Sequence, residues 1–409
     1  MSGPAMSAGA FLPYGRQSVD EDDIAAVVGV LRGDFLTQGP AVEAFESALA
    51  ARTGAAHAVA SANGTAALHL AYLALGLEPG DAVVVPANTF LATASAARLA
   101  GAEVAFADID PETGLMGAEQ AMAAVARARA AGWRPRVLAP VHFAGQCADM
   151  DALGTLAAAE GLAVVEDACH ALGALVRTGG ITAPVGACAR SAMAVFSFHP
   201  VKTIAAGEGG AVTTNDPALA TRLRHFRNHG MTRDPAGFSD HEAGLATDGT
   251  ANPWYYEMAE PGLNYRLTDI QSALALSQLT RLDAFVARRR RLMDLYATRL
   301  ISLAPLVRPL GRVSWCDPAW HLCVALIDFA AAGVGRAAVM AALRARGVGS
   351  QVHYIPVHRQ PYWRRRCPDL TLPGADAYYG QALSLPLFPA MTDGDVDRVV
   401  EALEALLTH

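Results

Sequence analysis

The sequence lacks the features of several common protein classes. Its six cysteines are scattered and form no CxxC pair, which argues against a zinc site and favours inert thiols in a reducing cytosol. No apolar run reaches the roughly 18–20 uncharged residues that cross a bilayer, since the run 24–31 ends at Arg32 and the run 153–165 contains Glu160. The formal net charge of −7 argues against nucleic acid as the main partner. We expect a cytoplasmic protein without a secretory signal, acting on neither nucleic acid nor membrane.

The chain is instead rich in short apolar runs that alternate with helical patterns in its first two thirds. We predict strands at 57–60, 81–85, 103–107, 137–141, 162–166, 192–198 and 210–213. This alternation predicts a mostly parallel sheet with helices on both faces. In such sheets ligands bind at the carboxyl ends of the strands.

The pattern changes near residue 265. The remaining chain is predicted to contain a long helix, a strand and two further helices, at 268–300, 321–327, 337–346 and 393–407. We therefore predict an N-terminal segment with a large domain over residues 1–265, and a smaller C-terminal α/β domain over 266–409. Within the first of these, residues 228–262 are rich in Gly, Asp and Pro and predict a long loop that is functional or makes contacts.

A single lysine, Lys202, follows the predicted strand 192–198 and precedes a glycine-rich run at 207–210. A lysine in a partly dry pocket loses its proton more easily and can attack a carbonyl carbon. The glycines would let the backbone approach a flat ligand closely. A structural role for a lone lysine at such a place is the competing interpretation.

An acid and an anion site are predicted at neighbouring strand ends. Asp167 follows an apolar strand, where a carboxylate can hold a ring nitrogen protonated or, alternatively, cap a helix. The stretch 61–67 contains Gly64 and Thr65 at a helix start, which binds anions or is a simple N-cap. Ser197 can add a hydroxyl, and Phe90 can stack on a ring face. Together with Lys202 these groups supply what pyridoxal phosphate (PLP) requires.

The sequence resembles the DegT-type sugar-nucleotide aminotransferases over about residues 11–408. The matching motifs are GDFLTQGP (33–40), ANGTAALHL (62–70), VPANTFLAT (85–93), VEDACHALG (165–173), FSFHPVKTIAAGEGG (196–210) and GLNYRLTDIQSA (262–273). The resemblance implies a fold type I PLP enzyme, with a seven-stranded sheet in its large domain and a homodimer that shares its active sites.

The resemblance also implies roles for single residues. Lys202 would bond covalently to the cofactor and then move a proton, and Asp167 would pair with the pyridine nitrogen. Phe90 would stack on the ring, and His170, where many members have glutamine, would contact the ring oxygen. The phosphate would be held by Gly64, Thr65, Ala66 and Ser197, and by Asn264 of the neighbouring subunit. Thr37 and Gln38 would lie near the substrate.

The run Gln351 to Tyr362, QVHYIPVHRQPY, resembles the C4 aminotransferases of pseudaminic acid biosynthesis. This implies amino transfer from L-glutamate to C4 of a UDP-linked 4-keto-6-deoxy-N-acetylhexosamine, with His353 and Tyr354 at the sugar-nucleotide site or merely packing the loop. Two alternatives stay open. One is a C3 or C4 aminotransferase for a dTDP- or GDP-linked sugar, and the other is a non-catalytic regulator that retains the fold.

Overall fold

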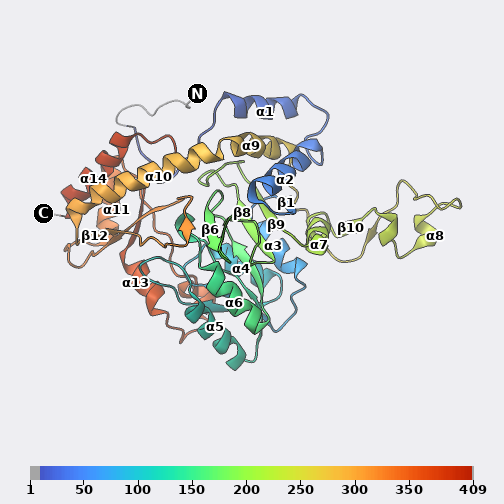
Figure 1. Cartoon of the computed structure of the whole chain (residues 1–409), viewed down its shortest axis with the longest axis horizontal. Coiled ribbons are helices and arrows are strands. Elements are labelled where there is room, and N and C mark those ends of the chain that lie inside the picture. Colours follow the sequence, from blue (N-terminus) through green and yellow to red (C-terminus); the bar gives the residue numbers. More distant parts are fainter. Residues whose placement is uncertain (1–9, 408–409) are drawn as a thin grey trace.

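A seven-stranded sheet forms the centre of the computed structural model, which describes residues 10–407 (Figure 1). Residues 1–9 and 408–409, which fall in the two predicted domains, lie outside the described residues. The strands in spatial order are β1 (His57–Ser61), β9 (Gly210–Thr214), β8 (Met193–Ser197), β5 (Ala163–Asp167), β4 (Arg134–Leu138), β2 (Asp81–Pro86) and β3 (Glu103–Ala107). Only β9 runs antiparallel to its neighbours, so the mostly parallel sheet is confirmed.

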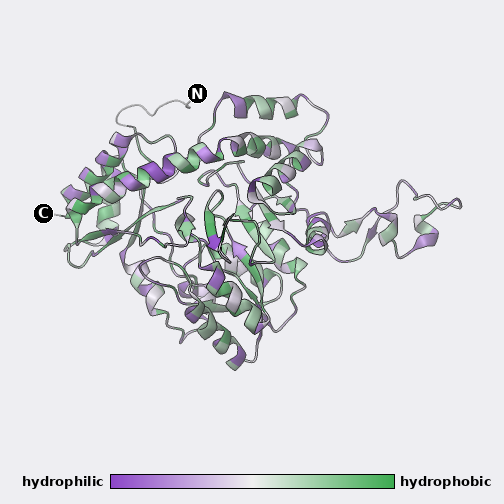
Figure 2. Ribbon diagram, viewed as in Figure 1, coloured by the Kyte–Doolittle hydropathy of each residue, from purple (hydrophilic) through white to green (hydrophobic). Residues whose placement is uncertain are grey.

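The central strands are apolar because helices cover both faces of the sheet. Every residue of β2 and β9 is buried, and the central strands are coloured mainly hydrophobic in Figure 2. The helices around the sheet are α2 (Pro40–Thr53), which precedes β1, then α3 (Gly64–Ala74), α4 (Leu91–Leu99), α5 (Ala118–Ala130) and α6 (Met150–Glu160) between strands, and α7 (Pro217–Arg227) after β9. Six of the strands match the prediction within one residue at each end, whereas β4 lies three residues earlier than the predicted strand 137–141.

The helical pattern predicted over 268–300 is divided into two helices, α9 (Asp269–Thr280) and α10 (Leu282–Arg299). The break is at Arg281, whose guanidinium forms an ion pair with the buried carboxylate of Asp23. Asp23 belongs to α1 (Glu21–Leu31), which lies along α9 in Figure 1. The N-terminal helix α1 therefore packs against α9. The domain boundary near residue 265 stays a prediction.

The C-terminal part contains a second sheet and a link back to the first part of the chain. Its sheet is formed by β12 (Val307–Pro309), β14 (Cys323–Ile327) and β15 (Ala382–Leu385). Its main helices are α11 (Arg336–Ala345), α13 (Pro373–Gln381) and α14 (Asp393–Leu407). A short strand, β13, instead joins a separate small sheet with two strands of the first part; these are β13 (Cys316–Asp317), β6 (Leu175–Thr178) and β7 (Ile181–Pro184).

The segment predicted as a long loop, 228–262, projects from the body of the molecule at the right of Figure 1. It is stabilised by pairing of β10 (Met231–Thr232) with β11 (Glu257–Met258) and includes α8 (His241–Gly244). Trp254 is 71% exposed on this arm. Within residues 10–407, no helix combines the length and the apolar character that a membrane span requires.

Candidate active site

A cavity of ≈ 880 Å³ opens at the carboxyl ends of β5 and β8. Asp167 is the last residue of β5 and Ser197 the last of β8, and the N-terminus of α3 faces the same space. The predicted site residues that line this cavity are Gly64, Thr65, Ala66, Phe90, Asp167, His170, Ser197, Lys202, His353 and Tyr354. The prediction that these strand ends converge on one site therefore agrees with the geometry.

Lys202 reaches the cavity from a turn just beyond β8. The backbone N–H of Lys202 donates a 2.8 Å hydrogen bond to the carbonyl oxygen of His199, and this bond stabilises the turn. Burial lowers the pKa of the Lys202 amine, and the nearby Cys169 and Asp167 oppose that shift in part. A lowered pKa increases the fraction of neutral amine, which is the nucleophilic form.

Asp167 is oriented by two hydrogen bonds. The hydroxyl of Thr93, in α4, donates to Oδ2 at 2.6 Å, and the N–H of Cys169 donates to Oδ1 at 3.2 Å. The side chain is buried, so these bonds act in a medium where charge interactions are strong. Sequence reasoning missed Thr93, although it ends one of the quoted motifs, because nothing local links it to Asp167.

The N-terminus of α3 provides an anion cradle. Asn63 caps the helix by accepting a 2.8 Å hydrogen bond from Ala66 N–H, whereas the N–H groups of Gly64 and Thr65 have no acceptor among the described residues. A Cβ atom on Gly64 would lie 2.8 Å from Cβ of Ser197. Glycine therefore allows the helix to approach the end of β8, where the two N–H groups and the Ser197 hydroxyl can hold a phosphate.

His170 also lines this cavity. Its Nε2 shares a 3.1 Å hydrogen bond with the hydroxyl of Tyr354, and its ring centroid is 4.4 Å from that of His321. Burial, then the charge of Lys202, lowers the pKa of His170 well below its usual value. His321 was not predicted from the sequence, because a lone histidine before a strand carries no distinguishing signal.

His353 and Tyr354 close the cavity from the C-terminal part of the chain. Nδ1 of His353 shares a 2.8 Å hydrogen bond with the hydroxyl of Ser384, and burial lowers the pKa of His353 to about 3. The ring of Phe90 is 55% exposed and lies 6.1 Å from that of Tyr354. One face of Phe90 is thus available for stacking on a planar ligand.

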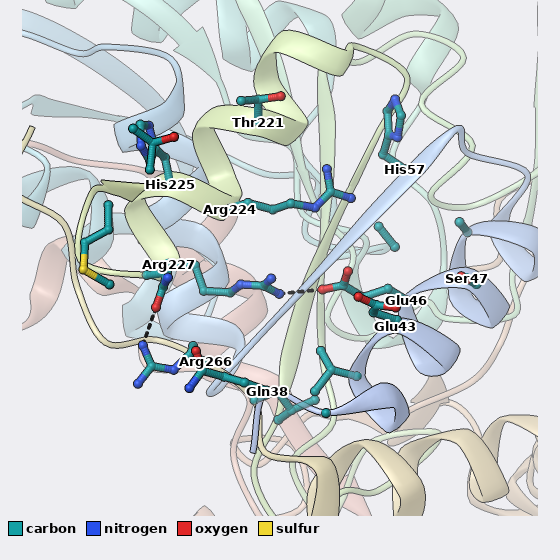
Figure 3. Close-up of a pocket in the computed structure, with 18 of the residues that line it drawn as sticks. Gln38, Glu43, Glu46, Ser47, His57, Thr221, Arg224, His225, Arg227 and Arg266 are labelled. Carbon is teal, nitrogen blue, oxygen red and sulfur yellow. Dashed lines mark hydrogen bonds and ion pairs between the residues drawn. The ribbon is translucent and has the colours of Figure 1, made fainter. Parts of the chain in front are cut away.

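Three predicted residues lie outside this cavity. Gln38 lines a second cavity of ≈ 830 Å³ between α2 and α7, where Arg227 pairs with Glu46 at 2.5 Å (Figure 3). Thr37 forms an isolated bridge with Thr268, and Asn264 forms one with Asn228. Asn264 is exposed. Their roles toward substrate and a neighbouring subunit stay predictions.

The residues around Lys202 fit PLP. They combine a buried primary amine, a carboxylate at a strand end, helix N–H groups beside a hydroxyl, and an exposed aromatic face. These match the aldehyde, the pyridine nitrogen, the phosphate and the ring of the cofactor in turn. Lys202 and Asp167 face the same cavity, as the sequence prediction required.

Comparison with known proteins agrees with this chemistry. The model of the DegT/DnrJ/EryC1/StrS aminotransferase family matches residues 17–404. PseC of Helicobacter pylori, an aminotransferase of pseudoaminic acid biosynthesis, has a TM-score of 0.85 at 26% identity over 97% of this chain and 99% of that one. DesI, solved with its TDP-sugar product, has a TM-score of 0.83 at 31% identity over 100% of this chain and 95% of that one.

A third relative concerns the cofactor directly. Spr1654 of Streptococcus pneumoniae, assigned as a sugar aminotransferase, has structures in a PLP form and a PMP form. The PMP form has a TM-score of 0.84 at 25% identity over 97% of this chain and 98% of that one. The family model covers nearly the whole chain, and the site fits the cofactor. The protein therefore belongs to the DegT/DnrJ/EryC1/StrS aminotransferase family and is a PLP-dependent sugar aminotransferase.

Proposed function

We propose that this enzyme moves an amino group from L-glutamate to C4 of a UDP-linked 4-keto-6-deoxy-N-acetylhexosamine, in a pathway to pseudaminic acid. The observation that carries the proposal is the position of His353 and Tyr354. They belong to the run 351–362, which resembles the C4 enzymes of that pathway, and they line the cavity that contains Lys202. The likeness to PseC over 97% of the chain supports the same substrate class.

A second candidate is a C3 or C4 aminotransferase for a dTDP- or GDP-linked keto sugar. DesI was solved with a TDP-sugar and is 31% identical to this chain, compared with 26% for PseC. His353 and Tyr354 recognise the sugar end of the substrate in our proposal, so they do not separate one nucleotide from another. The nucleotide is therefore the first variable to test.

Each residue of the site would have its own role in the reaction. When bound, PLP supplies an electron sink for the charge left as a proton leaves the carbon that bears the amino group. Lys202 would anchor the cofactor covalently in the resting enzyme, and its amine, when it is not in that bond, would take and return the proton, a role that commonly contributes ~10²–10⁴-fold to the rate. Asp167, oriented by Thr93, keeps a proton on the pyridine nitrogen. Gly64, Thr65 and Ser197 would hold the phosphate, whereas the N–H of Ala66 already donates to Asn63, and Phe90 would stack on the ring.

We also propose a cytoplasmic homodimer in which each subunit completes the site of the other. Asn264 is exposed and lies outside the cavity of its own chain, which fits a role toward a neighbour. The arm carries the exposed apolar side chains Trp254, Tyr256 and Met258, which would gain from burial in an interface. Six free cysteines are consistent with a reducing compartment.

The test is an assay with a panel of 4-keto and 3-keto sugars linked to UDP, dTDP and GDP, with nitrogen-labelled L-glutamate as donor. We expect label only in the UDP-linked 4-amino product, identified by mass spectrometry and by NMR of the aminated carbon. Faster turnover of a dTDP- or GDP-linked sugar would reject the UDP assignment. If the PLP-loaded protein places label in none of the products, L-glutamate is rejected as the amino donor.

A further inference from the structure

Two cysteines that are 169 residues apart in the sequence meet in the fold. The sulfur atoms of Cys147 and Cys316 lie 2.9 Å apart and share a hydrogen bond, and the N–H of Cys147 donates to the same Cys316 sulfur at 3.1 Å. Both side chains are buried. A disulfide bond of roughly 2.05 Å needs the sulfurs to approach by less than about 1 Å.

The two backbones are already held side by side, so the sulfurs need no large movement. The indole N–H of Trp315 donates to the carbonyl oxygen of Cys147 at 3.0 Å. Further along, Ala319 N–H donates to Gly145 O at 3.1 Å, and His321 N–H donates to Ala144 O at 2.8 Å. A Cβ atom on Gly145 would meet the Ala319 oxygen at 2.1 Å, so only glycine permits this approach.

We propose that Cys147 and Cys316 are a modification site that a peroxide converts into an intramolecular disulfide. This inference does not rest on the proposed substrate or on the cofactor. It replaces the expectation from the sequence that all six cysteines are inert, an expectation that followed from their scattered spacing. Both are free thiols, and among the described residues no other two cysteine sulfurs share a hydrogen bond.

Cys316 is the sulfur that reacts first. Hydrogen bonding from the thiol of Cys147 lowers the pKa of Cys316 in spite of its burial, whereas burial raises the pKa of Cys147 well above its usual value. Cys316 lies in β13, an edge strand whose next residue, Asp317, is exposed. In this proposal hydrogen peroxide reaches the buried Cys316 when the edge strand opens locally.

The oxidation of the two thiols to a disulfide takes two steps. The Cys316 thiolate attacks one oxygen of hydrogen peroxide, the O–O bond breaks, and hydroxide leaves, so that Cys316 becomes a sulfenic acid. The Cys147 sulfur then attacks the Cys316 sulfur, the S–O bond breaks, and hydroxide leaves with the Cys147 proton as water. Overall, two thiols are oxidised, one peroxide is reduced, and two water molecules form. A dithiol reductant reverses the bond by exchange.

The bond would have a structural consequence next to the active site. It would covalently join the segment after β4 to the segment that leads from β13 to His321, whose ring lines the Lys202 cavity. Closing so long a loop of chain restricts the unfolded state. The oxidised protein should therefore unfold at a higher temperature than the reduced protein when no reductant is present.

The test uses the full-length protein and counts thiols. The protein is treated with hydrogen peroxide, the excess is removed, and the free thiols are alkylated under denaturing conditions before intact-mass and peptide analysis. The chain has six cysteines, so we expect six alkylated thiols before treatment and two fewer afterwards, with the link mapped to Cys147 and Cys316. Dithiothreitol should restore all six.

Matched variants separate this pair from the other cysteines. Cys316→Ser and Cys147→Ser should each form no intramolecular link, whereas Cys188→Ser, which removes a buried thiol near Thr213, should form it as the wild type does. Six alkylated thiols in treated wild-type protein, or a link between other cysteines, would overturn the proposal. Because the readout is mass, a failure of the amino-transfer proposal would leave this result unchanged.

Discussion

Thr93 donates a 2.6 Å hydrogen bond to Oδ2 of Asp167 from 74 positions earlier in the chain. The Thr93 oxygen is in turn 2.7 Å from the hydroxyl of Thr89. Two hydroxyls therefore form a short chain that ends on the carboxylate assigned to the pyridine nitrogen. This arrangement orients Asp167 without neutralising its charge, which suits a group that must keep a ring nitrogen protonated.

Thr93→Val should lower kcat/KM with little effect on the fold, since valine has nearly the same shape. A hydrogen bond to a charged group is worth about 1.5–3 kcal/mol, which corresponds to a loss of roughly 10- to 100-fold. Asp167→Asn should cost more, ~10²–10³-fold. Thr155→Val, at an exposed position of α6, is the control and should match the wild type. Unchanged kinetics in Thr93→Val would show that Asp167 is oriented by other groups.

Lys202 is the only lysine in the chain, so its bond to the cofactor can be tested without ambiguity. We expect borohydride reduction of the PLP-loaded enzyme to fix the cofactor on the peptide that contains Lys202. Lys202→Ala should fold, as judged by circular dichroism, but lose at least about 10²-fold in turnover, the lower range for a general acid–base group. Label on any other peptide, or wild-type turnover in Lys202→Ala, would contradict the assignment.

Gly64→Ala should weaken cofactor binding, because the new methyl group would lie 2.8 Å from Cβ of Ser197 and push α3 away from β8. Overpacking of this kind commonly costs about 1–3 kcal/mol. The dissociation constant for PLP, from an absorbance titration, and the thermal midpoint should both shift. Gly29→Ala, where a Cβ meets nothing within 4 Å, should leave both unchanged. Equal PLP affinity in the two variants would argue against the predicted phosphate cradle.

The free energy of unfolding should decrease in acid, and the protonation of His353 should account for part of the decrease. Burial lowers the pKa of His353 from 6.5 to about 3. As the pH falls through that window, the unfolded chain takes up a proton that the folded chain does not, so the free energy of unfolding decreases. The full effect is on the order of 2–5 kcal/mol.

Urea unfolding across this pH range measures the effect of His353. His353→Asn keeps an acceptor near Nδ1 for Ser384 but removes the titrating ring, so its stability should depend less on pH than that of the wild type. His241→Asn, at an exposed position on the arm, is the control and should retain the wild-type slope. Parallel curves for the wild type and His353→Asn would exclude this contribution.

Several tertiary contacts had no counterpart in any local pattern of the sequence. Three contacts join distant segments: the hydrogen bond between Thr93 and Asp167, the tilted ring contact of His170 with His321, and the contact of the Cys147 and Cys316 sulfurs. The division of the predicted helix 268–300 at Arg281 also follows from a partner outside that segment, the buried carboxylate of Asp23. Such contacts depend on how layers pack, and spacing along the chain does not encode them.

The sequence by itself determined the order of strands and helices, the mostly parallel sheet, and the convergence of Lys202, Asp167, Ser197 and Gly64 on one cavity. The physical reason is that parallel strands end at the same edge of their sheet, so residues that follow them are brought together whatever the details of packing. Only the tertiary structure decided which groups orient those residues, how burial shifts their pKa values, and that Gln38 and Asn264 lie outside the Lys202 cavity. These properties arise from side chains of separate layers in contact, and they exist only once the chain has folded.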